Sequence, residues 1–90
     1  MLELGNLVMT QGIASIIGKN KLFENEIKAC FFRYVSCDWG DLCEEDKHIN
    51  NNALVNGERI LAKYNTSESP IYIITEWDRS VTTILLTEEY

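Results

Sequence analysis

Three cysteines and one histidine are the side chains of this 90-residue sequence that could bind a soft metal ion. They are Cys30, Cys37, Cys43 and His48, a C-x6-C-x5-C-x4-H spacing without the close pairs that zinc sites use. On a helix, Cys43 and His48 would lie about 140° apart around the axis. We therefore predict no metal site and no cofactor, with thiols that are buried or half-buried and a surface histidine.

A catalytic cysteine is equally unfavoured. Cys43 is expected near the start of a helix, but the carboxylates of Glu44, Glu45 and Asp46 follow it directly and oppose thiolate formation. There is no glycine-rich phosphate loop, no G-x-S-x-G and no H-E-x-x-H motif. The prediction is a protein that is not an enzyme and has no catalytic residues; a hydrolytic or metal-dependent enzyme ranks third among the functions considered.

The stretch Asp38-Trp39-Gly40-Asp41-Leu42 and the acids after it are more informative. Five carboxylates occur within nine residues, at Asp38, Asp41, Glu44, Glu45 and Asp46. One interpretation is structural: Asp41 as helix N-cap, Glu44 at the third helical position, and acids that interact favourably with the helix dipole. The other is a partner-binding surface in which Trp39 is an exposed aromatic beside the carboxylates.

A second candidate lies at Glu76-Trp77-Asp78-Arg79, expected at the tip of a hairpin. Tryptophan and arginine are enriched at interface hot spots. In the alternative interpretation, Arg79 pairs internally with a carboxylate and Trp77 covers the sheet edge. The predicted partner-binding residues are Asp38, Trp39, Glu44, Glu45, Asp46, Glu76, Trp77, Asp78 and Arg79.

Charge separates along the chain. Residues 1 to 37 have four basic and three acidic side chains, a net +1, and residues 38 to 90 have four basic and eleven acidic, a net −7, which together give the −6 of the whole chain. This excess of acids argues against direct nucleic-acid binding, but it suits a protein that covers a basic groove.

We expect a cytoplasmic protein: no apolar run reaches the ~18 residues of a membrane span, the start does not resemble a signal peptide, and three cysteines fit reduced thiols.

The elements that position these residues follow from periodicity. Leu2 to Met9 reads as a short extended or irregular lead-in, followed by a helix from an N-cap at Thr10 to Gly18. A second helix runs to about Val35, because its apolar residues share one helix face. They are Phe23, Ile27, Cys30, Phe31 and Tyr34.

A further helix is predicted at about 41-56, with Leu42, Ile49 and Ala53 inward, Asn50 to Asn52 mostly toward solvent, and an end at Asn56-Gly57. From Glu58 the period changes to two. Strands at about 58-64, 71-76 and 81-86 then form a three-stranded antiparallel sheet. The predicted fold is a single α+β domain, residues 1-90, with two or three N-terminal helices and the 41-56 helix packed on the sheet.

The second half of the sequence resembles a family of small uncharacterised proteins encoded on bacterial plasmids, integrative elements and phages. The resemblance rests on Asp38-Trp39-Gly40-Asp41-Leu42, Glu44-Glu45-Asp46, Ile74-Thr75-Glu76, the run from Asp78 to Leu85, and Glu88-Glu89-Tyr90. The family pattern has glycine at Cys37, histidine at Tyr34, alanine at Trp77 and proline at Thr87, so this sequence departs from it at four positions.

This resemblance implies a mobile-element protein that acts by protein binding. The function expected from it is an anti-defence inhibitor, anti-CRISPR or anti-restriction, that covers a basic nucleic-acid-binding surface. Its partner would be a host defence protein or ribonucleoprotein complex, and the protein itself a monomer or small homo-oligomer. The alternative is a structural or regulatory module that forms a homodimer through its apolar sheet or Phe32, with acids that serve capping and solubility.

Overall fold

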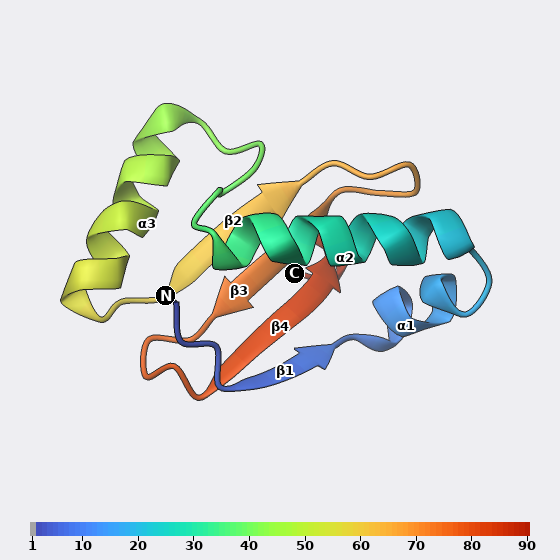
Figure 1. Cartoon of the computed structure of the whole chain (residues 1–90), viewed down its shortest axis with the longest axis horizontal. Helices are drawn as coiled ribbons and strands as arrows, with labels where there is room; N and C mark the ends of the chain where they lie inside the picture. Colours follow the sequence, from blue (N-terminus) through green and yellow to red (C-terminus); the bar gives the residue numbers. More distant parts are fainter. Residues whose placement is uncertain (1) are drawn as a thin grey trace.

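The computed structural model describes residues 2–90. Four strands, three α-helices and a final turn of 3-10 helix follow one another along the chain (Figure 1). In chain order they are β1 (Asn6–Met9), α1 (Gln11–Ile17), α2 (Lys21–Val35), α3 (Glu44–Asn56), β2 (Ile60–Tyr64), β3 (Ile71–Thr75), β4 (Val81–Leu86) and η1 (Thr87–Glu89). The predicted α+β class is confirmed, as are the α1 N-cap at Thr10 and the extent of α2 to Val35.

The sheet corrects the sequence prediction. It has four strands in the order β1-β4-β3-β2, and it is mixed because β1 runs parallel to β4. The predicted antiparallel meander of β2, β3 and β4 is present within it. The expected lead-in forms a strand because β4 leaves one edge unpaired, and Asn6 and Thr10 donate backbone hydrogen bonds to Ser80 and Ile84 along that edge.

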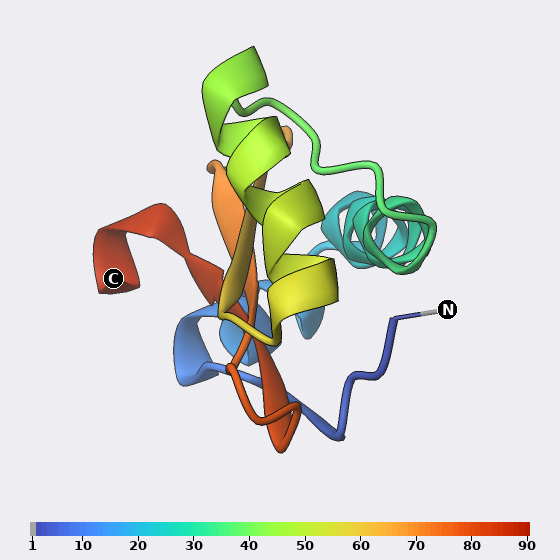
Figure 2. The same ribbon diagram turned by 90° about the vertical axis from the view of Figure 1, so that its left-hand side faces the viewer.

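Helix α2 covers one face of the sheet (Figure 2). Its buried residues are Phe23, Ile27, Cys30 and Tyr34, four of the five residues predicted to share that face, and the fifth, Phe31, packs partly buried beside them. They meet the inward residues of the strands, among them Ile73 and Ile84. The core therefore lies between α2 and one face of the sheet, and Ile13 of α1 and Ala53 of α3 complete it.

A chain of hydroxyl groups crosses this core. The Thr82 hydroxyl donates to the carbonyl oxygen of Leu4 at 2.7 Å, so it accepts from Thr75 at 2.8 Å, and Thr75 in turn accepts from the Tyr34 hydroxyl at 2.6 Å. Each of the three hydroxyl groups thus donates one hydrogen bond. This network ties α2, β3, β4 and the segment before β1 together, and burial raises the pKa of Tyr34 to about 12.

Helix α3 begins at Glu44, and its N-cap is two residues later than the predicted N-cap, Asp41. Asp41 does not cap it, since the Asp41 carboxylate accepts a hydrogen bond from the backbone N–H of Asn65 and its own N–H donates to Lys63. Cys43 is the N-cap, and its side chain makes no capping hydrogen bond. The predicted end is confirmed, because Gly57 adopts the left-handed conformation with a φ of 69°.

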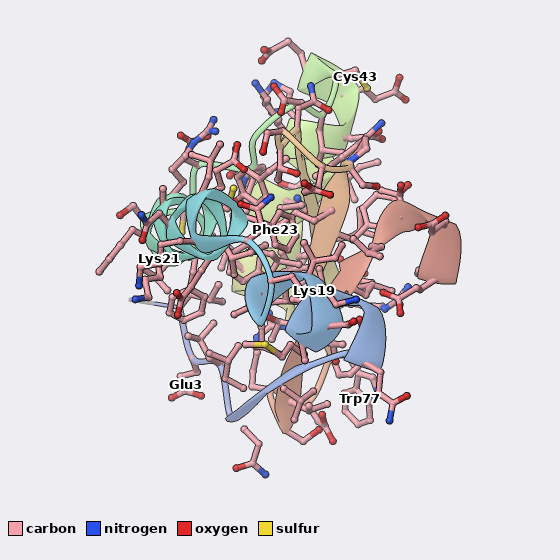
Figure 3. The ribbon with its side chains drawn as sticks, turned by 90° about the vertical axis from the view of Figure 1, so that its right-hand side faces the viewer. Glu3, Lys19, Lys21, Phe23, Cys43 and Trp77 are labelled. Atoms are coloured by element: carbon pink, nitrogen blue, oxygen red, sulfur yellow. The ribbon has the colours of Figure 1, made fainter. Side chains whose placement is uncertain are left out.

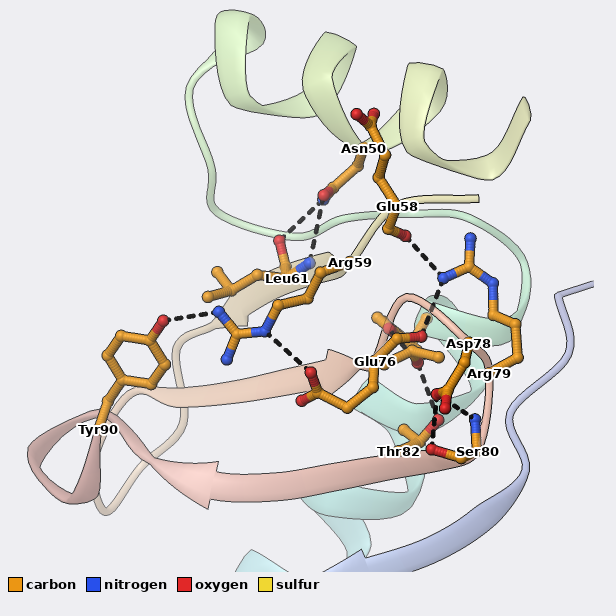
Figure 4. Close-up of polar contacts among 12 residues, drawn as sticks. Asn50, Glu58, Arg59, Leu61, Glu76, Asp78, Arg79, Ser80, Thr82 and Tyr90 are labelled. Atoms are coloured by element: carbon orange, nitrogen blue, oxygen red, sulfur yellow. Dashed lines mark hydrogen bonds and ion pairs between the residues drawn. The ribbon is translucent and has the colours of Figure 1, made fainter. Parts of the chain in front are cut away.

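The face of the sheet opposite α2 has the short 3-10 helix η1 on its side and, in residues 2–90, no α-helix as long as α2 over it (Figure 2). The C-terminal turn reaches this side, where Tyr90 packs edge-on against Tyr72 with ring centroids 5.3 Å apart. Arg59 donates to the Tyr90 hydroxyl at 2.8 Å and pairs with Glu76 at 3.5 Å (Figure 4). A tyrosine, an arginine and a carboxylate thus cover part of this face.

Candidate interaction surface

Trp39 is buried, which corrects the expectation of an exposed aromatic. It is 3% exposed, and its ring packs edge-on against Tyr34 with centroids 5.6 Å apart. Its indole N–H donates to the side chain of Asn51 on α3 at 2.9 Å. Trp39 therefore joins α2 to α3 and presents almost no surface to a partner.

Asp38 is also engaged within the protein. The chain leaves α2 through a left-handed residue, Cys37, with a φ of 63°, and the N–H groups of Cys37 and Asp38 donate to the carbonyls of Tyr34 and Arg33. This is a Schellman motif, in which the left-handed position is usually glycine. The turn aims Asp38 back at Arg33, which donates two hydrogen bonds of 2.8 and 3.3 Å to the carboxylate.

The pKa of Asp38 is lowered, first by the hydrogen bond from Arg33 and then by one from the backbone N–H of Gly40. Its carbonyl oxygen accepts from the buried Tyr64 hydroxyl at 2.6 Å. Both oxygens of the Asp38 carboxylate therefore accept hydrogen bonds from within the protein, and Asp38 stabilises the turn after α2.

Gly40 and its neighbours close the outer edge of β2. Gly40 forms a parallel bridge with Lys63, in which Lys63 N–H donates to Trp39 and Asp41 N–H donates to Lys63 at 2.7 Å. Two residues earlier in β2, the side-chain amide of Asn50 on α3 pairs with the backbone of the same edge. It donates to Leu61 O at 2.8 Å and accepts from Leu61 N–H at 3.2 Å (Figure 4). The Asp38 to Leu42 stretch is thus part of how the sheet edge is protected.

Three of the predicted acidic residues make no tertiary hydrogen bond or ion pair among the described residues. Glu44, Glu45 and Asp46 form the exposed first turn of α3. Their one recorded ion pair joins Glu44 to Lys47 at 3.6 Å, and the Glu44 side chain is still 86% exposed. These carboxylates interact favourably with the helix dipole, but no tertiary contact of the described residues requires them.

Two separate apolar side chains follow these acids on the exposed surface of α3. The helix buries only Asn50 and Ala53, and it exposes Ile49 at 55% and Val55 at 86%. Ile49 was predicted inward, and Asn50 toward solvent; the two are exchanged because the Asn50 amide pairs with the β2 edge. The periodicity of α3 could have shown that Val55 has no place on the buried side.

Arg79 lies at the other end of α3 and is not an exposed hot spot. Its guanidinium donates to the carbonyls of Glu58 at 2.7 Å and Glu76 at 3.1 Å (Figure 4), and also to that of Ala53 at 3.0 Å. It thereby satisfies the C-terminal end of the helix, where a positive charge is favourable. Arg79 is bound internally, but its partners are backbone carbonyls and not the carboxylates that the alternative interpretation predicted.

The rest of the β3–β4 loop is largely internal too. Glu76 pairs with Arg59, and Asp78 accepts from the backbone N–H and hydroxyl of Ser80 at 3.1 and 2.6 Å, which lowers the Asp78 pKa. Trp77 alone is both exposed, at 67%, and free of these contacts. Its exposure fits the predicted partner-binding role, which stays a prediction.

The two predicted clusters are far apart. Glu44 begins α3, whereas the β3–β4 loop meets its last turn at Ala53 through Arg79, so most of this 13-residue helix, which is about 20 Å long, separates them. Figure 3 shows the same separation, with Cys43 and Trp77 at opposite ends of the molecule. The candidate interaction surface is therefore the outer face of α3, defined by Glu44, Glu45, Asp46, Ile49 and Val55.

Other kinds of site are not found in residues 2–90. No group of three His, Cys, Asp or Glu side chains there is placed to hold a metal ion, and no pocket is present. Over the same range, none of the helices combines the length and apolarity needed to span a bilayer. Cys30 is buried, Cys37 half-buried and Cys43 exposed, and all three are free thiols.

Comparison of the chain with protein-family models, with curated proteins and with solved structures found no match in any of the three.

Proposed function

We propose that this protein acts by binding another protein through the outer face of α3. The observation that carries the proposal is the composition of that face: three carboxylates in the first turn, Ile49 about one turn further on and Val55 in the last turn, none of which the fold buries. A charged rim next to exposed apolar side chains is the usual anatomy of a protein-binding patch. The net charge of −6 selects a partner with a basic surface.

The specific form of the proposal is an anti-defence inhibitor, anti-CRISPR or anti-restriction, that covers a basic nucleic-acid-binding surface of a host complex. The acidic α3 and the resemblance of residues 38 to 90 to mobile-element proteins support it. Docking of carboxylates onto a surface made for phosphates would displace nucleic acid by competition.

The test is survival of a targeted plasmid in cells with an active CRISPR or restriction system. Expression of the protein should raise transformation by that plasmid. The variant Glu44→Gln, Glu45→Gln, Asp46→Asn should lose about tenfold or more of the protection, because removal of three charges from one patch slows association with a basic partner. Val55→Ser should weaken protection without changing the charge.

A matched control changes the net charge equally at exposed acids outside the patch: Glu3→Gln, Glu58→Gln, Glu88→Gln. This variant should protect as the natural protein does. Equal loss in both triple variants would mean that overall charge, and not the α3 face, matters. Absence of protection against every system tried would overturn the anti-defence role.

A further inference from the structure

The two edges of the sheet are treated differently. On β2, Leu61 and Lys63 direct backbone groups outward, and both are paired, with Asn50 and with the Trp39 to Asp41 segment. The other edge is β1, whose side chains Leu7, Val8 and Met9 are 46%, 43% and 44% exposed. Strand β1 has no lysine, no proline and no bulge, the features by which natural edge strands avoid pairing.

The free backbone groups of β1 can be assigned. Asn6 N–H and Thr10 N–H donate to Ser80 and Ile84, so residues 6, 8 and 10 direct their backbone toward β4. In a parallel ladder the residues between them point the other way. Leu7 and Met9 therefore direct their N–H and C=O groups outward, away from the sheet.

This arrangement is complementary to itself. If a second copy pairs antiparallel with its Val8 opposite Val8, Leu7 lies opposite Met9 of the other copy, and the outward groups of these residues form four N–H···O hydrogen bonds. Leu7 and Met9 share one face of β1 through their register with Thr82 and Ile84, and Val8 lies on the other with Thr83. Each apolar side chain then faces an apolar partner.

We propose that this chain forms a symmetric dimer by antiparallel pairing of β1 with β1, which gives one continuous eight-stranded sheet. The strand is short, so the interface is small and the dimer is a weak one that forms with rising concentration. The same pairing brings the β3–β4 loop, with the exposed Trp77, beside the start of α1 of the other copy. The α3 faces lie at the outer ends of the dimer, so it would present them twice.

The first test measures mass by sedimentation equilibrium up to about 1 mM protein. The natural chain should shift toward twice its monomer mass as concentration rises. Val8→Lys should remain a monomer, since it places two like charges opposite each other at the symmetry axis. The matched control is Phe32→Lys on α2, a residue that is 70% exposed and is the competing apolar site.

The second test fixes the register. With Val8 opposite Val8 in a non-hydrogen-bonded pair, the Cα atoms are about 4.5 Å apart, within disulfide range. Two Leu7 residues would be about 8 Å apart, from two steps of about 3.4 Å along the strand and a spacing of about 4.8 Å, which is too far. Oxidised glutathione should therefore link Val8→Cys into a covalent dimer much faster than Leu7→Cys.

Both cysteine variants are made with Cys43→Ser, which removes the exposed natural thiol, and that background alone is the control. Monomer mass throughout the range, a dimer dissociated by Phe32→Lys and not by Val8→Lys, or equal linkage of Val8→Cys and Leu7→Cys would each overturn the proposal. These readouts do not depend on the anti-defence role, because the β1 edge and the α3 face are separate surfaces.

Discussion

At the scale of residues, two glycines of the same conformation have different tasks. Gly40 and Gly57 both have positive φ, 78° and 69°. Gly57 ends α3 in open space, whereas a Cβ at Gly40 would lie 2.1 Å from Lys63 O and 2.6 Å from the Tyr64 ring. The sequence predicted Gly57 as a helix end, because Asn-Gly is a local signal. The contact of Gly40 with β2 joins residues 23 apart, and no local pattern encodes it.

Gly40→Ala should lower the free energy of unfolding by about 3 kcal/mol or more, because the backbone cannot move away without losing the bridge to Lys63. Gly57→Ala is the control and should cost about 1 kcal/mol, the strain of the left-handed conformation alone. Urea unfolding of both variants measures the difference. Equal losses would show that the close approach at Gly40 adds nothing.

At the scale of elements, the predictable parts were those fixed by local period. The apolar spacing of α2 and the alternation of β2 to β4 placed these elements within a few residues. Strand β1 was missed because its partner β4 is about 75 residues away and no hairpin joins them. The start of α3 was predicted too early because Asp41 is used by Asn65 and Lys63, contacts that compete with the capping box.

Asn50→Ala tests whether α3 is held to the sheet by its amide. The change leaves Leu61 N–H and C=O without their partners, so it should cost about 2 to 3 kcal/mol of unfolding free energy. Hydrogen exchange of the Leu61 amide should become faster. Asn52→Ala, exposed on the same helix, is the control and should be neutral or slightly stabilising, because alanine is the better helix former. If Asn50→Ala lowered the unfolding free energy no more than Asn52→Ala does, the role of the Asn50 amide in holding α3 to the sheet would be contradicted.

At the scale of the whole molecule, the fold explains why so much of the predicted site is internal. Helix α2 is the main cover of one sheet face and the core is small, so polar contacts supplement it: Asp38 with Arg33 and Arg79 with α3 at its margins, and the Tyr34 hydroxyl chain within it. A cluster of charged and aromatic residues in the sequence can either stabilise the fold or bind a partner. Which of the two it does depends on its tertiary contacts. Among the described residues, the exposed surfaces that these contacts leave without an internal partner include the α3 face, Trp77, Phe32 and the β1 edge.

Buried tyrosines make the stability of this molecule sensitive to alkali. The pKa of Tyr34 is raised to about 12 and that of Tyr64 is also raised, in both cases mainly by burial. The unfolded chain therefore loses these protons near pH 10, before the folded protein does. The stabilisation is complete below about pH 10 and is lost as pH rises toward 12, by about 3 kcal/mol for Tyr34.

Urea unfolding at about pH 9 and about pH 11 measures this loss, and Tyr34→Phe separates Tyr34 from the other groups that titrate there. Phenylalanine removes the hydroxyl and its hydrogen bond to Thr75, so the variant should be about 1 kcal/mol less stable at pH 9. It should also lose less stability between the two pH values, by about 1.4 kcal/mol for the one unit above pH 10. Equal losses of unfolding free energy in the two proteins would contradict the raised pKa of Tyr34, because the Tyr34 hydroxyl is the only titrating group in which they differ.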